Sequence, residues 1–84
     1  MHPATTVYTR PNCVQCRSTF RALDERGVTY TKVNVAEDET AAEYVRGLGH
    51  KQAPVIVIDT PTQPVHWSGF NPILIETHFG PKAA

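Results

Sequence analysis

The chain has two cysteines, Cys13 and Cys16, which are separated by two residues. The thiolate form of a cysteine attacks a disulfide bond and forms a mixed disulfide, which a second thiolate nearby then resolves. A free thiol has a pKa of about 8.5, so such a pair needs surroundings that favour the anion near neutral pH. The C-x-x-C spacing therefore indicates dithiol–disulfide exchange.

The cysteine pair follows a short β-prone run and opens a helix-prone run over about residues 13–26. The unpaired N–H groups and the positive dipole end of a first helical turn favour a negatively charged sulfur, and Cys13 lies where this effect is greatest. Cys16, Phe20 and Leu23 follow the spacing i, i+4, i+7 of one helix face. We therefore expect Cys16 to face the core as the resolving thiol and Cys13 to face solvent as the nucleophile.

Two other interpretations of the cysteine pair are half of a zinc site and an inert buried pair. A Cys2His2 site needs two closely spaced histidines. The four histidines of the chain are at least a dozen residues apart, at His2, His50, His66 and His78. A zinc site is thus a minor alternative, and the sequence assigns no metal ligand and no role to a histidine.

Length and charge limit the classes of function. The chain of 84 residues is expected to form a single domain over residues 1–84. Eight basic and eight acidic side chains balance, without a basic run, which argues against nucleic acid and acidic membranes as partners. Neither a signal peptide nor a membrane span is evident. We expect a cytoplasmic protein, and in that compartment a lone cysteine pair is more often catalytic than structural.

The remaining sequence predicts the elements that position the cysteines. Strands are predicted over residues 4–9, 29–35, 55–58 and 64–68, and helices over 13–26, between 37–39 and the glycines at 47 and 49, and over 72–79. The first strand, helix and strand form a right-handed parallel unit. The run 55–58 is apolar throughout and indicates a strand buried on both faces. The run 64–68 begins with proline, as an edge strand can.

Helix ends carry capping signals. Gly27 is expected to close the first helix in the left-handed conformation. Thr40 with Glu43 is expected to form a capping box at the second helix. Asn71 before Pro72 is a good pair for the N-cap and first position of the third.

Several short motifs, combined with the order β-α-β-α-β-β-α, point to one family. These motifs are Tyr8-Thr9-Arg10, Cys13-Val14-Gln15-Cys16, Arg21-Ala22-Leu23, Asn34-Val35, Gln52-Ala53-Pro54-Val55 and Trp67-Ser68-Gly69-Phe70. In them the chain resembles the NrdH-redoxins, glutaredoxin-like proteins of the thioredoxin superfamily, over nearly its full length. The resemblance implies an α/β fold of the thioredoxin/glutaredoxin type, with a four-stranded mixed sheet flanked by three helices.

The resemblance also implies which residues contact partners. It places a cis-proline at Pro54 beside the cysteines, whereas the sequence alone favours a trans bond. It places residues 67–70 next to the Cys-Val-Gln-Cys loop, as part of an apolar surface for proteins. The alternative is that Trp67 only packs at the edge of the core. The implied partner-binding residues are Val14, Gln15, Ala53, Pro54, Trp67, Ser68, Gly69 and Phe70.

The same segment bears on the electron donor. Glutathione-dependent glutaredoxins typically have a glycine pair and then acidic residues here, and Pro-Tyr between the cysteines. This chain has Gly69-Phe70-Asn71-Pro72 and Val14-Gln15 instead. The resemblance therefore implies electrons from NADPH through thioredoxin reductase, class Ib ribonucleotide reductase as the client, no bound cofactor, and a monomer. The NrdH pattern usually has arginine and aspartate where this chain has Asn71 and Ile73.

Three questions stay open in the sequence. A glutathione-dependent glutaredoxin is the nearest alternative function. A metal- or iron–sulfur-binding module that uses the cysteines as ligands is an alternative of another class. Arg10, Arg17 and Lys51 are either charges that favour the Cys13 thiolate or exposed side chains in solvent.

Overall fold

The computed structural model describes residues 4–82, so the N-terminal stretch with His2 lies outside the described residues. The elements are β1 (Thr5–Thr9), α1 (Val14–Asp24), β2 (Thr31–Asn34), α2 (Glu39–Gly47), β3 (Val55–Ile58), β4 (Val65–Ser68) and α3 (Pro72–Phe79). The predicted element order is confirmed. None of these helices is long and apolar enough to cross a membrane within the described residues.

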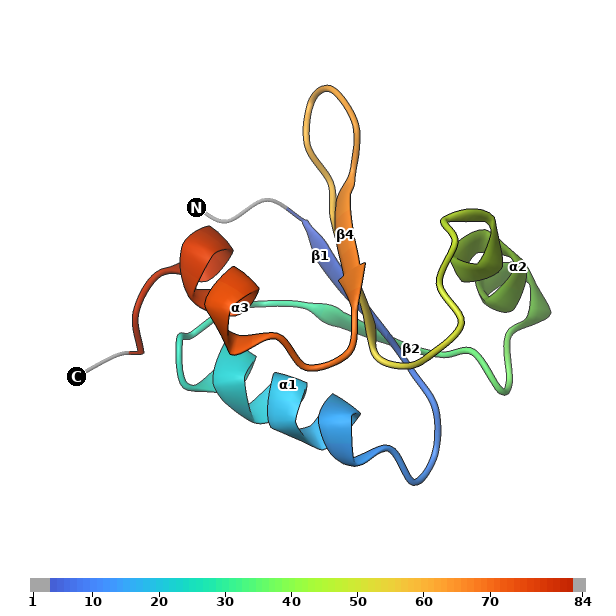
Figure 1. The fold of residues 1–84 in the computed structure, drawn as a ribbon, viewed down its shortest axis with the longest axis horizontal. Helices are drawn as coiled ribbons and strands as arrows, with labels where there is room; N and C mark the ends of the chain where they lie inside the picture. The colour runs from blue at the N-terminus through green and yellow to red at the C-terminus, as the bar shows by residue number, and fades with distance from the viewer. Residues whose placement is uncertain (1–3, 83–84) are drawn as a thin grey trace.

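The four strands form one mixed sheet in the order β2-β1-β3-β4. Strand β1 runs parallel to β2 and antiparallel to β3, and β4 pairs antiparallel with β3 at the edge. The helices α1 and α3 lie together on one side of the sheet, and α2 lies on the other (Figure 1). This arrangement confirms the predicted fold class.

Strand β3 is the centre of the core because its side chains point alternately to the two helical layers. Ile56 and Ile58 pack toward α1 and α3, in a cluster that contains Leu23 and Ile75. Val55 and Val57 pack with Val45 of α2. All four residues of the strand are buried, which confirms the strand with two buried faces.

One of the predicted helix caps differs from the cap in the structure. The predicted capping box of Thr40 and Glu43 is wrong, because Asp38 is the N-cap of α2 and its carboxylate accepts a hydrogen bond from the Ala41 N–H at 3.0 Å. Aspartate is among the strongest N-cap residues, so it starts the helix before the threonine. At α3 the Asn71 side chain caps the Leu74 N–H at 3.0 Å, as predicted.

Other boundaries shift by a few residues. Helix α1 begins after Cys13 and ends at Asp24, inside the predicted range 13–26. Gly27 has the expected left-handed backbone, with φ of 68°. Strand β2 covers only the central part of the predicted run 29–35.

Candidate active site

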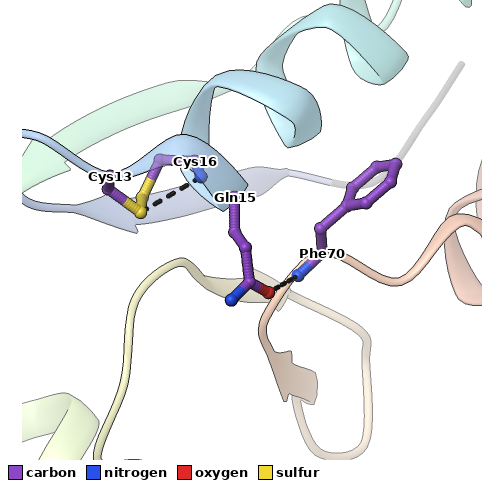
Figure 2. Close-up of a disulfide and its surroundings, with 4 residues drawn as sticks. All are labelled: Cys13, Gln15, Cys16 and Phe70. Carbon is purple, nitrogen blue, oxygen red and sulfur yellow. Dashed lines mark hydrogen bonds between the residues drawn. A yellow bond between two sulfur atoms is a disulfide. The ribbon is translucent and has the colours of Figure 1, made fainter.

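Cys13 is the N-cap residue of α1, and its sulfur does the capping. Its backbone is extended, with φ of −108° and ψ of 104°. The Cys16 N–H donates a hydrogen bond to Cys13 Sγ at 3.1 Å, as Figure 2 shows. A backbone donor aimed at the sulfur, at the positive end of a helix, stabilises a thiolate there. The helix therefore begins in the geometry that a nucleophilic cysteine needs.

Cys13 and Cys16 form a disulfide, with their Cα atoms 5.2 Å apart. Cys13 is half-buried, whereas Cys16 is 2% exposed. The expected asymmetry between the two cysteines is thus present. It leaves Cys13 as the sulfur that a client can reach, and the roles of nucleophile and resolving thiol follow as a prediction.

Three segments far apart in the sequence meet beside the disulfide. From the loop between the cysteines, Gln15 Oε1 accepts a hydrogen bond from the Phe70 N–H at 2.9 Å (Figure 2). From the segment before β3, the Pro54 carbonyl accepts one from the Gly69 N–H at 2.8 Å. The Ala53–Pro54 peptide bond is cis, as the resemblance implied. Gly69 and Phe70 therefore bridge the other two segments.

Gly69 needs to be glycine for two separate reasons. Its φ is +83°, a conformation that side chains disfavour, and an added Cβ would lie 3.1 Å from Gln15 Oε1. The close approach lets the backbone of this segment reach the Gln15 amide. The residue thus holds the Cys-Val-Gln-Cys loop against the segment that follows β4.

Three apolar side chains in the Cys-Val-Gln-Cys loop and at the start of α3 are exposed, and Trp67 is not among the exposed residues. Trp67 is only 7% exposed and belongs to the core cluster under α3, where its ring stacks on His78 at 5.5 Å. Phe70 is 38% exposed, Val14 66% and Ile73 77%. The structure therefore places Trp67 in the core, and Phe70 is the exposed aromatic side chain of the 67–70 segment.

A cavity of about 380 Å³ lies over the disulfide. It is lined by Cys13 and Gln15 from one side and by Lys51 and Ala53 from the other, with Arg10 at the end of β1. The lining has two basic side chains and no carboxylate. Arg17, the third basic candidate, is exposed and does not line the cavity.

A pair of histidines that the sequence analysis missed adjoins residues 51–53, which line the cavity. His50 Nε2 lies 2.7 Å from His66 Nδ1, and the two rings meet edge to face with centroids 4.9 Å apart. Burial, and after it the charge of His66, lowers the pKa of His50 from its ordinary value of 6.5. No cluster of three or more His, Cys, Asp or Glu residues suited to a metal ion occurs between residues 4 and 82.

Comparisons with known proteins identify the family of the chain. The model of the Glutaredoxin family matches residues 5–61. The glutaredoxin-like protein NrdH of Escherichia coli K12 is 41% identical over 80 residues, which cover 94% of each chain. The NrdH protein of Salmonella typhimurium LT2 is 42% identical over the same shares.

Solved structures show the same relationship. The NrdH-redoxin of Escherichia coli superposes with a TM-score of 0.78 at 40% identity, over 88% of this chain and 92% of that one. A glutaredoxin from Brucella melitensis has a TM-score of 0.66 at 23% identity, over 90% and 79% of the chains, and shares the fold. With its Cys13–Cys16 pair, the chain belongs to the glutaredoxin family, as a thiol–disulfide oxidoreductase of the NrdH type.

Proposed function

We propose that this redoxin reduces protein disulfides with electrons that thioredoxin reductase passes to it from NADPH, and that class Ib ribonucleotide reductase is its main client. The observation that carries the choice of reductant is the segment after Gly69. It presents the apolar ring of Phe70 and an asparagine whose side chain already caps α3, at 3.0 Å from the Leu74 N–H. No carboxylate is available in this segment to hold the ammonium group of glutathione.

Exposed apolar side chains in the Cys-Val-Gln-Cys loop and at the start of α3 support contact with proteins. Val14 follows the nucleophile directly, and Phe70 and Ile73 lie at the start of α3. Burial of such side chains against a partner is favourable, and exposed aromatic residues are frequent anchors of interfaces. The related Escherichia coli structure is described as having a thioredoxin-like activity profile, which fits a redoxin served by a protein reductase.

The exchange then proceeds in two steps. In the reduced protein, the Cys13 thiolate attacks one sulfur of the client disulfide, which breaks that bond, forms a mixed disulfide and releases the other client sulfur as a thiolate. Cys16 loses its proton and attacks Cys13 Sγ, which forms the Cys13–Cys16 disulfide and releases the second client thiolate. Two electrons have passed to the client, and thioredoxin reductase returns two electrons to the redoxin.

The client is proposed to lie as an extended segment over the disulfide. The cavity there is lined by Ala53, whose backbone we assign to pairing with the client, and by Gln15. Pro54 and Gly69 hold this wall through their 2.8 Å hydrogen bond. Val14, Ser68 and Phe70 complete the assigned contacts, and Trp67 supports them from the core.

The family relationship and the chemistry support the remaining assignments. Turnover by a dithiol requires a reducing compartment, so we assign the protein to the cytoplasm. The protein holds its redox equivalents in the two cysteines and needs no cofactor of its own. We assign it a monomeric state, since a client has to reach Cys13.

The test is NADPH oxidation coupled to reduction of insulin disulfides, with either thioredoxin reductase or glutathione and its reductase as the donor. The proposal expects turnover with thioredoxin reductase alone, followed by support of class Ib ribonucleotide reductase. Turnover only with glutathione would instead identify a glutathione-dependent glutaredoxin. Absence of turnover with both donors, together with metal or colour in protein purified without oxygen, would identify a metal- or iron–sulfur-binding module.

A further inference from the structure

The histidine pair links two parts of the chain that the strand pairing brings together. His66 lies on the edge strand β4, opposite Val57 of β3. His50 lies in the loop between α2 and β3, where its own N–H donates to the Val45 carbonyl at 3.2 Å. The imidazole contact of 2.7 Å therefore ties this loop to the edge of the sheet.

A second hydrogen bond holds the other end of the same loop. The Pro54 carbonyl accepts the hydrogen bond from Gly69, the residue that follows β4. The segment between the two ties carries Lys51, Gln52 and Ala53, which line the cavity over the disulfide. Strand β4 and Gly69 thus hold both ends of the wall that faces Cys13.

We propose that His50 and His66 act as positioning residues, whose shared hydrogen bond holds the 50–54 loop beside the disulfide and is released when both rings are protonated. One neutral ring is enough to accept an N–H from the other, whether that other ring is neutral or charged. Two imidazolium rings have no acceptor between them and repel each other. The consequence for exchange rests on the function proposed above, whereas the consequence for the loop does not.

The groups around His50 disfavour the state in which both imidazole rings are protonated. Arg46 of α2, Lys51 of the loop and Arg10 after β1 line the same cavity of about 240 Å³ as His50, together with the Tyr8 ring of β1. Arg46 is also paired with Glu39 at 3.1 Å, on the exposed side of α2. From β4 the facing group is His66, and no carboxylate lines this cavity. The His50–His66 hydrogen bond is therefore expected to form near neutral pH and hold the 50–54 loop in place, and acid is expected to break it.

The variants separate the hydrogen bond from the titration. His66→Ala removes the bond at every pH. The double change His50→Gln with His66→Asn keeps a donor and an acceptor near the positions of Nε2 and Nδ1 but cannot titrate. His78→Gln serves as the matched control, since it removes an imidazole from α3, on the other side of the sheet.

The readout is the protection of single amides against hydrogen exchange, measured by NMR at pH 7.5 and 4.5 and corrected for the intrinsic exchange rate. The amides of His50 and Gly69 report the two ties, and that of Val35, bonded to the Thr9 carbonyl, is the internal reference. In the wild type, protection of His50 and Gly69 should fall by roughly three- to tenfold at pH 4.5, the size expected for one lost hydrogen bond. In His66→Ala, protection of the two amides should be low at both pH values. In the double amide variant it should be high at both. His78→Gln should show the same fall in protection as the wild type.

Equal protection in wild type and His66→Ala at pH 7.5 would overturn the proposal, as would an acid response that the double amide variant retains. With insulin as client, the double variant should also recover the rate that His66→Ala loses. Because amide exchange needs no reductant, the loop result stands even where neither electron donor supports turnover, so the two proposals fail independently.

Discussion

Gln15 Oε1 and the Phe70 N–H are hydrogen-bonded at 2.9 Å across 55 residues of sequence. The bond makes the loop between the cysteines and the segment after β4 a single surface. Replacement of Gln15 by Ala should lower the free energy of unfolding by about 1 kcal/mol, the usual net value of a hydrogen bond. Urea denaturation measures this loss, and Gln15→Glu, which keeps the acceptor, should lose less. An equal loss in both variants would count against the bond as the cause.

Gly69→Ala should destabilise the protein more than Gly49→Ala. Both glycines have left-handed backbones, with φ of +83° and +94°, which cost an alanine about 1–2 kcal/mol. Only at Gly69 does the added Cβ meet a neighbour, Gln15 Oε1 at 3.1 Å. The difference in the free energy of unfolding between the two variants, measured by urea denaturation, isolates that contact. This difference should be smaller in a protein that also carries Gln15→Ala.

Cys13→Ser should abolish disulfide reduction, and Cys16→Ser should accumulate a mixed disulfide with the client. The reason is the asymmetry between a half-buried sulfur and one that is 2% exposed. Mass spectrometry of the trapped species identifies the cysteine that carries the client. Full activity in the Cys13→Ser protein would contradict the assigned roles.

Phe70→Ala should raise the KM for thioredoxin reductase by about tenfold, in the range of a moderate interface anchor. Urea denaturation measures the accompanying loss of stability, because only 38% of the Phe70 surface is exposed. Tyr44→Ala is the control, since Tyr44 is an aromatic residue of similar exposure (41%) on α2, on the opposite side of the sheet. Equal effects of the two changes would remove the argument for a docking surface around Phe70.

Stability should fall as the pH is lowered through about 6.5, the ordinary pKa of histidine. Burial and the charge of His66 lower the pKa of His50 in the folded protein, so the unfolded chain binds the proton first. The contribution is complete above the unfolded pKa and declines toward the lowered folded value. The urea midpoint at pH 7.5 and 5.5 measures it, and a drop as large in the His50→Gln variant would assign it elsewhere.

Local patterns predicted the parts of the fold that local chemistry determines. The four apolar residues of β3 and the Asn71-Pro72 start of α3 are examples in which side-chain type decides burial or capping. At α2 the prediction chose Thr40 as the cap, whereas Asp38, which lies just before it, is the N-cap in the structure. The C-x-x-C pair was identified with its asymmetry for the same local reason.

Features that depend on how strands align were not predictable in the same way. The His50–His66 contact needs the register that sets His66 opposite Val57, and nothing in the spacing of 16 residues indicates it. The burial of Trp67 follows likewise from its position opposite Ile56 on β3. An aromatic residue at an edge strand can point to either face, and a shift of one residue would reverse the choice.

The sulfur of Cys13 caps α1 and is also the predicted nucleophile, so the helix cap and the predicted attack use the same atom. When Cys13 attacks a client, its negative charge disappears, and the first turn loses the charge–dipole part of its cap until the Cys13–Cys16 disulfide that forms next is reduced again. Changes that strengthen this cap make the thiolate more abundant but also less nucleophilic, because nucleophilicity falls with basicity. A stronger helix cap therefore does not give faster disulfide exchange without limit. The sequence of α1 that gives the fastest exchange is not the one that forms the most stable helix.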